Sequence, residues 1–200
     1  DAEDIIALKP DTVILATGAT MIPPDWLPDS IREEGWVPDL RAAMPEVLRH
    51  SGKQDGTAVL YDMDHTEATY ACAEALRERF SRVVIVTPRD TIATDVQMVT
   101  RQGILRRMAE QRIEIVPLCE PRWSDACAEG QLELVNVYTG DVQVIEEVAL
   151  LTYATPRAPD NALAAPLEAA GIRVIPVGDA RAPQEMLFAT ASGHAAGETV

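Results

Sequence analysis

Cysteine is scarce in this sequence, and the few cysteines show no motif spacing. The 200 residues contain three, Cys72, Cys119 and Cys127, with no C-x-x-C pair among them. A disulfide framework, a structural zinc site or an iron–sulfur cluster needs a fuller set of well-spaced ligands, so none is expected from these residues. Free cysteines are typical of a reducing compartment, and we expect a cytoplasmic location.

Basic residues are also scarce. Lys and Arg number 17 against 32 Asp and Glu, which gives a net charge of −15. Nucleic-acid binding is not expected, because phosphate contacts need clustered Lys and Arg. No apolar run approaches the roughly 18 residues that span a membrane, and no signal peptide is visible, so no membrane partner is expected. The acidity fits a solvated surface, and its functional alternative is a docking surface for an electron-transfer protein.

Strand and helix patterns alternate through the middle of the chain. Residues 57–61 and 82–87 are apolar runs typical of buried strands, and residues 66–80 between them have the pattern of a helix. Such a strand–helix–strand unit joins parallel strands. The later elements expected are a helix at 100–111, a strand at 113–117 and an antiparallel hairpin of 132–138 with 142–149. The predicted fold class is therefore α/β, a Rossmann-like three-layer domain with a parallel sheet and a β-meander.

The turn after the first strand of this domain lacks glycine. A dinucleotide-binding unit needs G-x-G-x-x-G there, so that the backbone and a helix N-terminus can approach the pyrophosphate. This chain has Tyr61-Asp-Met-Asp-His-Thr-Glu-Ala68, with three carboxylates in place of the glycines. Arg89, after the second strand, could meet a 2′-phosphate, but the acidic turn opposes it. We predict that NAD(P)H binds this domain weakly or not at all.

The acidic turn admits two further interpretations. Asp62, Asp64, His65 and Glu67 could form an oxygen-rich site for Mg²⁺ or Ca²⁺, but the D-x-D-x-D-G calcium pattern is absent. The simpler interpretation is a solvated loop in which Asp64 or Thr66 caps the following helix. No metal site is predicted. No catalytic residue is predicted in this chain either, because no G-x-S-x-G and no nucleophile with a motif-linked base is present.

Two stretches near the chain ends have the form of a nucleotide site. One apolar strand ends in Ala16-Thr17-Gly18, and another ends in Gly178-Asp179 before a helix expected to begin at Gln184. Small residues let a ligand approach the backbone, Asp179 can accept hydrogen bonds from ribose or ribityl hydroxyls, and a helix N-terminus offers free N–H groups. The predicted cofactor-binding residues are Ala16, Thr17, Gly18, Gly178, Asp179 and Gln184.

Together, Asp11–Ala19 and Val177–Pro183, the latter reading Val-Gly-Asp-Ala-Arg-Ala-Pro, resemble the flavoproteins with two dinucleotide-binding domains. Within them, the chain is most similar to the C-terminal region of the 2,4-dienoyl-CoA reductase / trimethylamine dehydrogenase group. These are the long members of the old yellow enzyme family of NADH:flavin oxidoreductases. The resemblance implies part of a flavin oxidoreductase, either a dienoyl-CoA reductase or an amine dehydrogenase or demethylase. A divergent disulfide-reductase-like domain is the alternative, but no redox C-x-x-C or C-x₄-C supports it.

The resemblance also implies the domain order. Residues 1–20 and 151–200 would form a partial FAD/ADP-binding domain, 56–150 an inserted NAD(P)-binding-like domain, and the Pro-rich stretch 21–55 a connector. In the connector, 39–49 is expected to be a short helix interrupted or restarted at Pro45, and 52–56 a turn.

We expect this chain to be a fragment whose N-terminal barrel, with FMN and a 4Fe-4S cluster, is its main partner. FAD or ADP would bind the fragment weakly, because the Gly-rich loop that supplies most phosphate contacts would lie upstream. The non-enzymatic alternative is a docking module for an electron-transfer protein.

Overall fold

The structure, a computed structural model, describes residues 1–200 and divides into two compact units. The central unit is Pro23–Pro156, and the outer unit combines Asp1–Ile22 with Arg157–Val200. The sequence assigns residues 151–156 to the outer part, and the structure draws this boundary after Pro156 instead. The reason is that residues 151–154 belong to the strand Val148–Ala154, which pairs with the central sheet rather than leaving it.

A four-stranded parallel sheet forms the middle of the central unit, as the strand–helix–strand pattern predicts. Its strand order is β5-β4-β3-β9. The apolar runs Ala58–Leu60 and Val83–Val86 are fully buried, because both faces of the sheet are covered. Residues 54–56 lie in the first strand and not in a turn. The strands are β3 (Gln54–Asp62), β4 (Phe80–Val86), β5 (Glu114–Val116) and β9 (Val148–Ala154).

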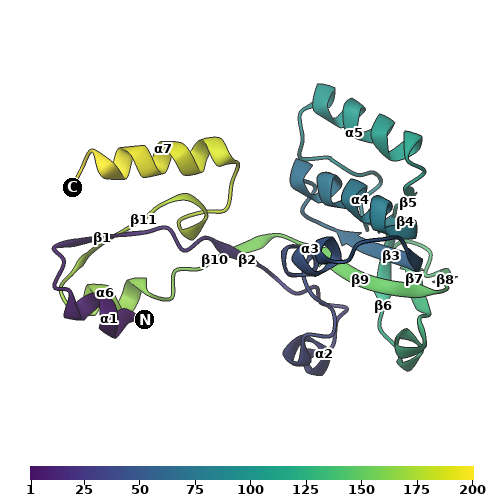
Figure 1. Cartoon of the computed structure of the whole chain (residues 1–200), viewed down its shortest axis with the longest axis horizontal. Helices are drawn as coiled ribbons and strands as arrows, with labels where there is room; N and C mark the ends of the chain where they lie inside the picture. Colours follow the sequence, from purple (N-terminus) through teal and green to yellow (C-terminus); the bar gives the residue numbers. More distant parts are fainter. The chain divides into compact units, whose positions relative to one another are not determined.

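Helices cover one face of this sheet and an antiparallel meander covers the other, which confirms the three-layer prediction (Figure 1). The meander has the strand order β6-β7-β8. The helices are α3 (Leu40–Arg49), α4 (Glu67–Arg79) and α5 (Met98–Glu110). The meander consists of β6 (Cys119–Arg122), the 3₁₀ helix η1 (Asp125–Glu129), β7 (Leu132–Asn136) and β8 (Val142–Ile145).

The connector is more regular than its proline content predicts. It contains α2 (Asp29–Glu34), and α3 runs through Pro45 without interruption. The Asp39 carboxylate caps α3 by accepting the N–H groups of Arg41 and Ala42 at 2.8 and 3.0 Å. Leu40, Ala43, Met44 and Val47 on one side of α3 are buried, and this packing compensates for the hydrogen bond that Pro45 cannot donate.

The outer unit consists of two short sheets and small helices (Figure 1). Strands β1 (Thr12–Leu15) and β11 (Arg173–Pro176) pair in parallel, and β2 (Ala19–Met21) and β10 (Arg157–Pro159) pair antiparallel. The remaining elements are α1 (Ala2–Ala7), α6 (Ala164–Ala169), the 3₁₀ helix η2 (Gly178–Ala180) and α7 (Met186–Gly197). None of the chain's helices has the length and apolarity that crossing a membrane requires.

Candidate functional site

The pairing of β1 with β11 brings the two terminal stretches together. Leu15 lies opposite Pro176 in the parallel register, and the Val177 N–H donates to the Leu15 carbonyl at 3.0 Å. The small residues that follow β1 and the Gly-Asp pair that follows β11 therefore leave the same edge of this sheet. The sequence predicts this adjacency, and the structure confirms it. The carboxyl ends of neighbouring parallel strands are where α/β folds bind ligands.

The segment after β1 presents open backbone. Gly18 has a φ of +87°, and a Cβ placed there would have no atom within 4 Å. The carbonyl of Gly18 accepts the Asp160 N–H at 2.9 Å, and the Thr17 hydroxyl donates to the Asp160 carbonyl. The backbone N–H groups of Thr17 and Gly18 donate to no group of the chain, and Ala16 and Thr17 are exposed. Two adjacent backbone donors without a partner in the chain thus lie just after the end of β1.

Gly178 allows α7 to approach β11 closely. Its φ is +55°, and an added Cβ would lie 3.3 Å from the Ala189 Cβ. Its N–H donates to the Ser192 hydroxyl of α7 at 2.8 Å, so it is already satisfied within the protein. The sequence predicts that this glycine makes room for a ligand, whereas in the structure it makes room for the helix.

Asp179 is held by two groups of the outer unit. Its Oδ2 accepts from the Arg157 guanidinium, and its Oδ1 accepts the Gln184 N–H at 3.2 Å. The Arg157 and Asp179 side chains are 12% and 21% exposed, so the pair is shielded but still reached by solvent. Gln184 lies before α7, which begins at Met186, and its N–H is used by Asp179 rather than offered by a helix terminus. Arg157 was missed by sequence reasoning, because no motif links it to Asp179.

The acidic turn of the central unit is not a solvated loop, and this part of the prediction is wrong. Asp62 is fully buried. Its Oδ2 accepts the Tyr70 hydroxyl at 2.6 Å, and its Oδ1 accepts the His65 backbone N–H at 3.0 Å. Burial raises the pKa of the Asp62 carboxyl, an effect that His65 and the Tyr70 hydrogen bond partly offset.

His65 is buried beside this carboxylate in a left-handed conformation, with φ at +52°. Its Nε2 lies 3.4 Å from the Thr87 hydroxyl, while its Nδ1 has no hydrogen-bond partner and lies 3.9 Å from Asp62 Oδ2. Burial lowers the pKa of the imidazole, against the attraction of Asp62. The turn is therefore locked by inward-pointing polar groups.

The capping prediction for α4 is also wrong in detail. Thr66 occupies the N-cap position, but its side chain makes no capping hydrogen bond. Asp64 Oδ2 instead accepts the hydroxyls of Thr66 and Thr69, at 2.5 and 3.2 Å. No three His, Cys, Asp or Glu side chains in the chain are arranged to hold a metal ion.

In the central unit, the loop after β4 lies at the carboxyl ends of the strands, beside the acidic turn that follows β3. The Ala93 N–H donates to the Tyr70 hydroxyl at 2.6 Å, and Ile92 and Ala93 are fully buried. Arg89, the residue suited to a 2′-phosphate, donates to the Thr94 hydroxyl at 2.9 Å and to the Asp95 carboxylate at 3.3 Å. The chain's own side chains thus occupy the edge at which a Rossmann-like domain would meet a dinucleotide.

No family model matches the sequence, and no curated protein sequence matches it. Solved structures do resemble it. Histamine dehydrogenase from Rhizobium sp. 4-9 superposes with a TM-score of 0.76 at 25% identity, over 98% of this chain and 31% of its own. A 2-naphthoyl-CoA reductase superposes with a TM-score of 0.78 at 20% identity, over 100% of this chain and 28% of its own. Thioredoxin reductase from Lactococcus lactis gives 0.70 at 20% identity, over 94% of this chain and 64% of its own.

These structures share the α/β, Rossmann-like fold of this chain, which confirms the predicted fold class. An amine dehydrogenase and a CoA-ester reductase are also the two kinds of enzyme in the group that the sequence resembles. The chain spans less than a third of the length of either.

Proposed function

We propose that this chain is the nucleotide-binding region of a flavin-dependent oxidoreductase of the amine dehydrogenase or CoA-reductase type. The catalytic barrel, with FMN and a 4Fe-4S cluster, would belong to another part of a longer polypeptide. The supporting observation is the parallel pairing of β1 with β11, which sets Thr17-Gly18 beside Gly178-Asp179. Two backbone donors, of exposed Thr17 and half-buried Gly18, and the partly exposed Asp179 carboxylate then lie at the carboxyl ends of the strands, where such folds bind nucleotides.

The residues of the outer unit fit FAD or ADP. Thr17 and Gly18 would offer their N–H groups to a phosphate or ribityl oxygen, since both groups have no partner in the chain. Asp179 keeps lone pairs free for a hydroxyl, and the Arg157 guanidinium compensates its charge, which would otherwise repel a phosphate. A flavin dinucleotide bound here would supply electron transfer, whereas ADP would be a structural ligand only.

The central unit would keep the fold of an NAD(P) domain without its ligand. Glycines are replaced by Asp62–Glu67, and the space they would open is filled by buried Asp62, His65 and Tyr70. A pyrophosphate would have to displace these groups and approach the Asp62 and Asp64 carboxylates, which is unfavourable. Electron transfer in the whole enzyme would therefore not depend on NAD(P)H bound at this domain.

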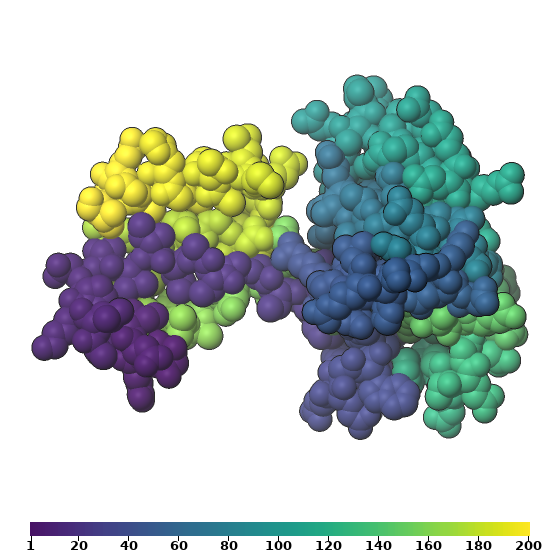
Figure 2. Space-filling model, viewed as in Figure 1, coloured from purple at the N-terminus to yellow at the C-terminus, as the bar shows by residue number.

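Open surfaces of the outer unit support the fragment proposal. Met186, Leu187 and Phe188 at the start of α7 are 83%, 71% and 54% exposed, and α7 lies along the surface of this unit (Figure 2). The parallel sheet has two strands, so β1 and β11 each keep an unpaired edge. Exposed apolar side chains and open edges at one unit are typical of a surface that further polypeptide covers.

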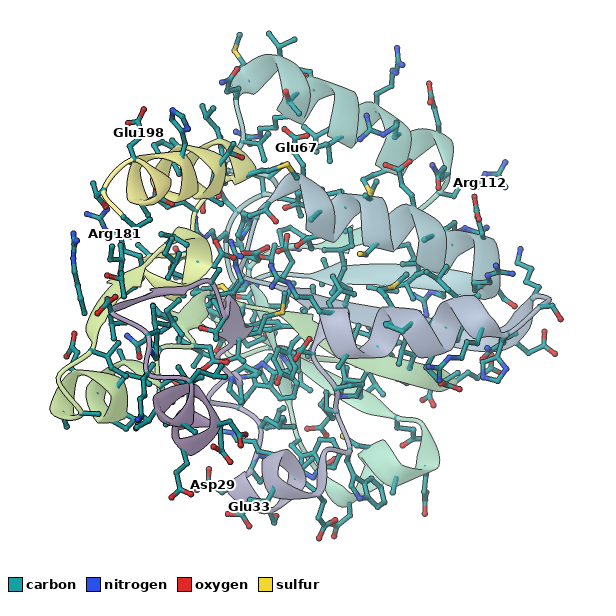
Figure 3. All side chains as sticks on the ribbon, turned by 60° about the vertical axis from the view of Figure 1, so that its left-hand side comes forward. Asp29, Glu33, Glu67, Arg112, Arg181 and Glu198 are labelled. Carbon is teal, nitrogen blue, oxygen red and sulfur yellow. The ribbon has the colours of Figure 1, made fainter.

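Carboxylates on α2 and in the loop before it favour a second candidate function, the docking module. Asp25, Asp29, Glu33 and Glu34 are all exposed, and the side chains of Asp29 and Glu33 project away from the ribbon (Figure 3). This surface would bind a basic electron-transfer protein. Its affinity would fall steeply with salt, unlike nucleotide binding that rests on hydrogen bonds.

Titration of the chain with FAD and ADP, followed by calorimetry, tests the first proposal. We expect weak binding that falls about tenfold in Asp179→Ala, which removes a charge-assisted acceptor. Asp11→Ala, an exposed carboxylate at the start of β1, is the matched control and should bind like the parent. Equal affinity of Asp179→Ala and the parent would contradict the site.

A further inference from the structure

The central unit contains a cavity that the nucleotide fold does not explain. Its volume is about 150 Å³, and it is a partly open cavity lined by the segment between α2 and α3, the meander, and strand β9. Because β9 is the edge strand of the sheet, one side of its backbone has no strand partner along this cavity. The lining residues that matter below are Trp36, Trp123, Cys127, Gln131, Leu132 and Leu150.

Two of the chain's three tryptophans line this cavity. Trp36 is 60% exposed, and Trp123 is half-buried. Neither indole contacts another ring, because the one ring–ring contact of the chain joins Trp26 to Tyr61, edge to face at 5.5 Å. No other ring of the chain therefore stacks on either indole. Exposing the apolar ring of a tryptophan to water is unfavourable. Aromatic residues make up 4% of the sequence, yet two tryptophans lie at this one cavity.

The remaining lining defines the charge of the ligand. No Asp, Glu, Lys, Arg or His lines the cavity, so a charged ligand would find no partner there. Gln131 also lines the cavity and is exposed, and its side-chain amide supplies a donor and an acceptor for one polar group. Leu132 and Leu150 supply apolar walls.

We propose that this cavity binds an uncharged single-ring aromatic compound with one hydrogen-bonding substituent, of the phenol type. The ring would stack on Trp36 and Trp123, and the hydroxyl would bond to the Gln131 amide. A cavity of about 150 Å³ is large enough for one benzene ring. The site lies wholly within the central unit and is independent of the nucleotide site proposed in the outer unit.

Protection of Cys127 from alkylation tests the proposal on the 200-residue chain. Cys127 lines the cavity, whereas Cys72 on α4 does not, and both thiols are half-buried. Phenol should slow N-ethylmaleimide labelling of Cys127 severalfold, measured by mass spectrometry, and leave Cys72 unchanged. Cyclohexanol, which has similar size but no π-face, should protect far less. Equal protection by both alcohols, or equal slowing of both thiols, would overturn the proposal.

Variants identify the contacts. Trp36→Ala should raise the phenol concentration for half-protection about fivefold, the effect of one stacking contact of about 1 kcal/mol. Gln131→Leu should weaken phenol binding but not toluene binding. Leu48→Ala, at an exposed leucine of α3 outside the cavity, should change neither. Saturation-transfer NMR with phenol measures binding directly. The absence of a transfer signal, or an affinity of Trp36→Ala for phenol equal to that of the parent, would also overturn the proposal.

Discussion

Tyr70 and Asp62 form a fully buried hydrogen bond, in which the tyrosine hydroxyl donates to Oδ2 at 2.6 Å. The same hydroxyl accepts the Ala93 N–H at 2.6 Å, so it joins the turn after β3 to the loop after β4. A carboxylate that the sequence places in a solvated turn thereby becomes part of the core. Its position is the one that a dinucleotide-binding fold reserves for glycine and phosphate.

Removal of this hydroxyl should destabilise the central unit. Tyr70→Phe leaves the Asp62 Oδ2 and the Ala93 N–H without partners in the core, and we expect a loss of about 3 kcal/mol in the free energy of unfolding. Urea denaturation measures it. Tyr153→Phe is the matched control, since the Tyr153 hydroxyl donates no hydrogen bond, and it should change the stability by less than about 0.5 kcal/mol. A Tyr70→Phe protein as stable as the parent would contradict the lock described for this turn.

His65 should make stability depend on pH. Burial lowers its pKa in the folded state, with the charge of Arg89 acting in the same direction and Asp62, Asp95 and Asp64 opposing. As the pH falls through 6.5, the ordinary value, the unfolded chain takes up a proton before the folded chain does. His65 therefore contributes stability above this pH and loses up to about 1.4 kcal/mol per pH unit below it. Asp62 acts in the opposite direction, because its raised pKa favours the folded state as it takes up a proton.

Comparison with a variant separates the two effects. His65→Asn tolerates the positive φ, and the stability of the parent relative to this variant should fall between pH 7.5 and 5.5. Urea midpoints at both pH values measure it. His194→Asn is the control, since the His194 side chain is 77% exposed beside Glu198. The same pH dependence in the parent and in His65→Asn would refute the assignment.

Gly178 should be intolerant of a side chain. Alanine at this φ is strained, and its Cβ would lie 3.3 Å from the Ala189 Cβ, so Gly178→Ala should cost about 1–2 kcal/mol and shift α7. Gly193→Ala, within α7 and with nothing within 4 Å, should instead be neutral or stabilising by about 0.5–1 kcal/mol. Thermal unfolding of the two variants measures the difference. Equal changes in stability for Gly178→Ala and Gly193→Ala would contradict the prediction.

Arg157 should hold Asp179 in place. Arg157→Gln leaves a largely shielded carboxylate without its cation, and we expect a loss of about 2 kcal/mol in stability together with weaker ADP binding. Arg173→Gln, an exposed arginine of β11, should change stability by less than about 0.5 kcal/mol. Calorimetry of both variants measures the stability and the affinity for ADP. Equal changes in the two variants would show that Arg157 does not hold Asp179 in place.

The fold was largely predictable because its strands are short apolar runs that alternate with helices. The pairing of β1 with β11 also followed, although about 160 residues separate them, because each ends in small residues typical of a nucleotide site. The interruption at Pro45 was wrong, since packing of Leu40, Met44 and Val47 outweighs one missing hydrogen bond.

The interior of the acidic turn could not be predicted from local sequence. Asp62 is buried because Tyr70, in the first turn of α4, bonds to it, and Ala93, beyond β4, bonds to the same Tyr70 hydroxyl. Charge alone favours exposure for such a residue, and the compensating partners are set by tertiary structure. Arg157 beside Asp179 is a similar case, because the two are 22 positions apart in the sequence and no spacing rule links them.

We place the nucleotide site in the outer unit and not in the central one. The shift in melting temperature on adding nucleotides tests this placement most directly. FAD, ADP, NADH and NADPH would be added at millimolar concentration to the parent protein and to Asp179→Ala. The account predicts that FAD or ADP raises the melting temperature of the parent, that Asp179→Ala reduces the rise, and that NADH and NADPH leave the melting temperature unchanged. Stabilisation by NADH or NADPH, or by none of the four, would contradict it.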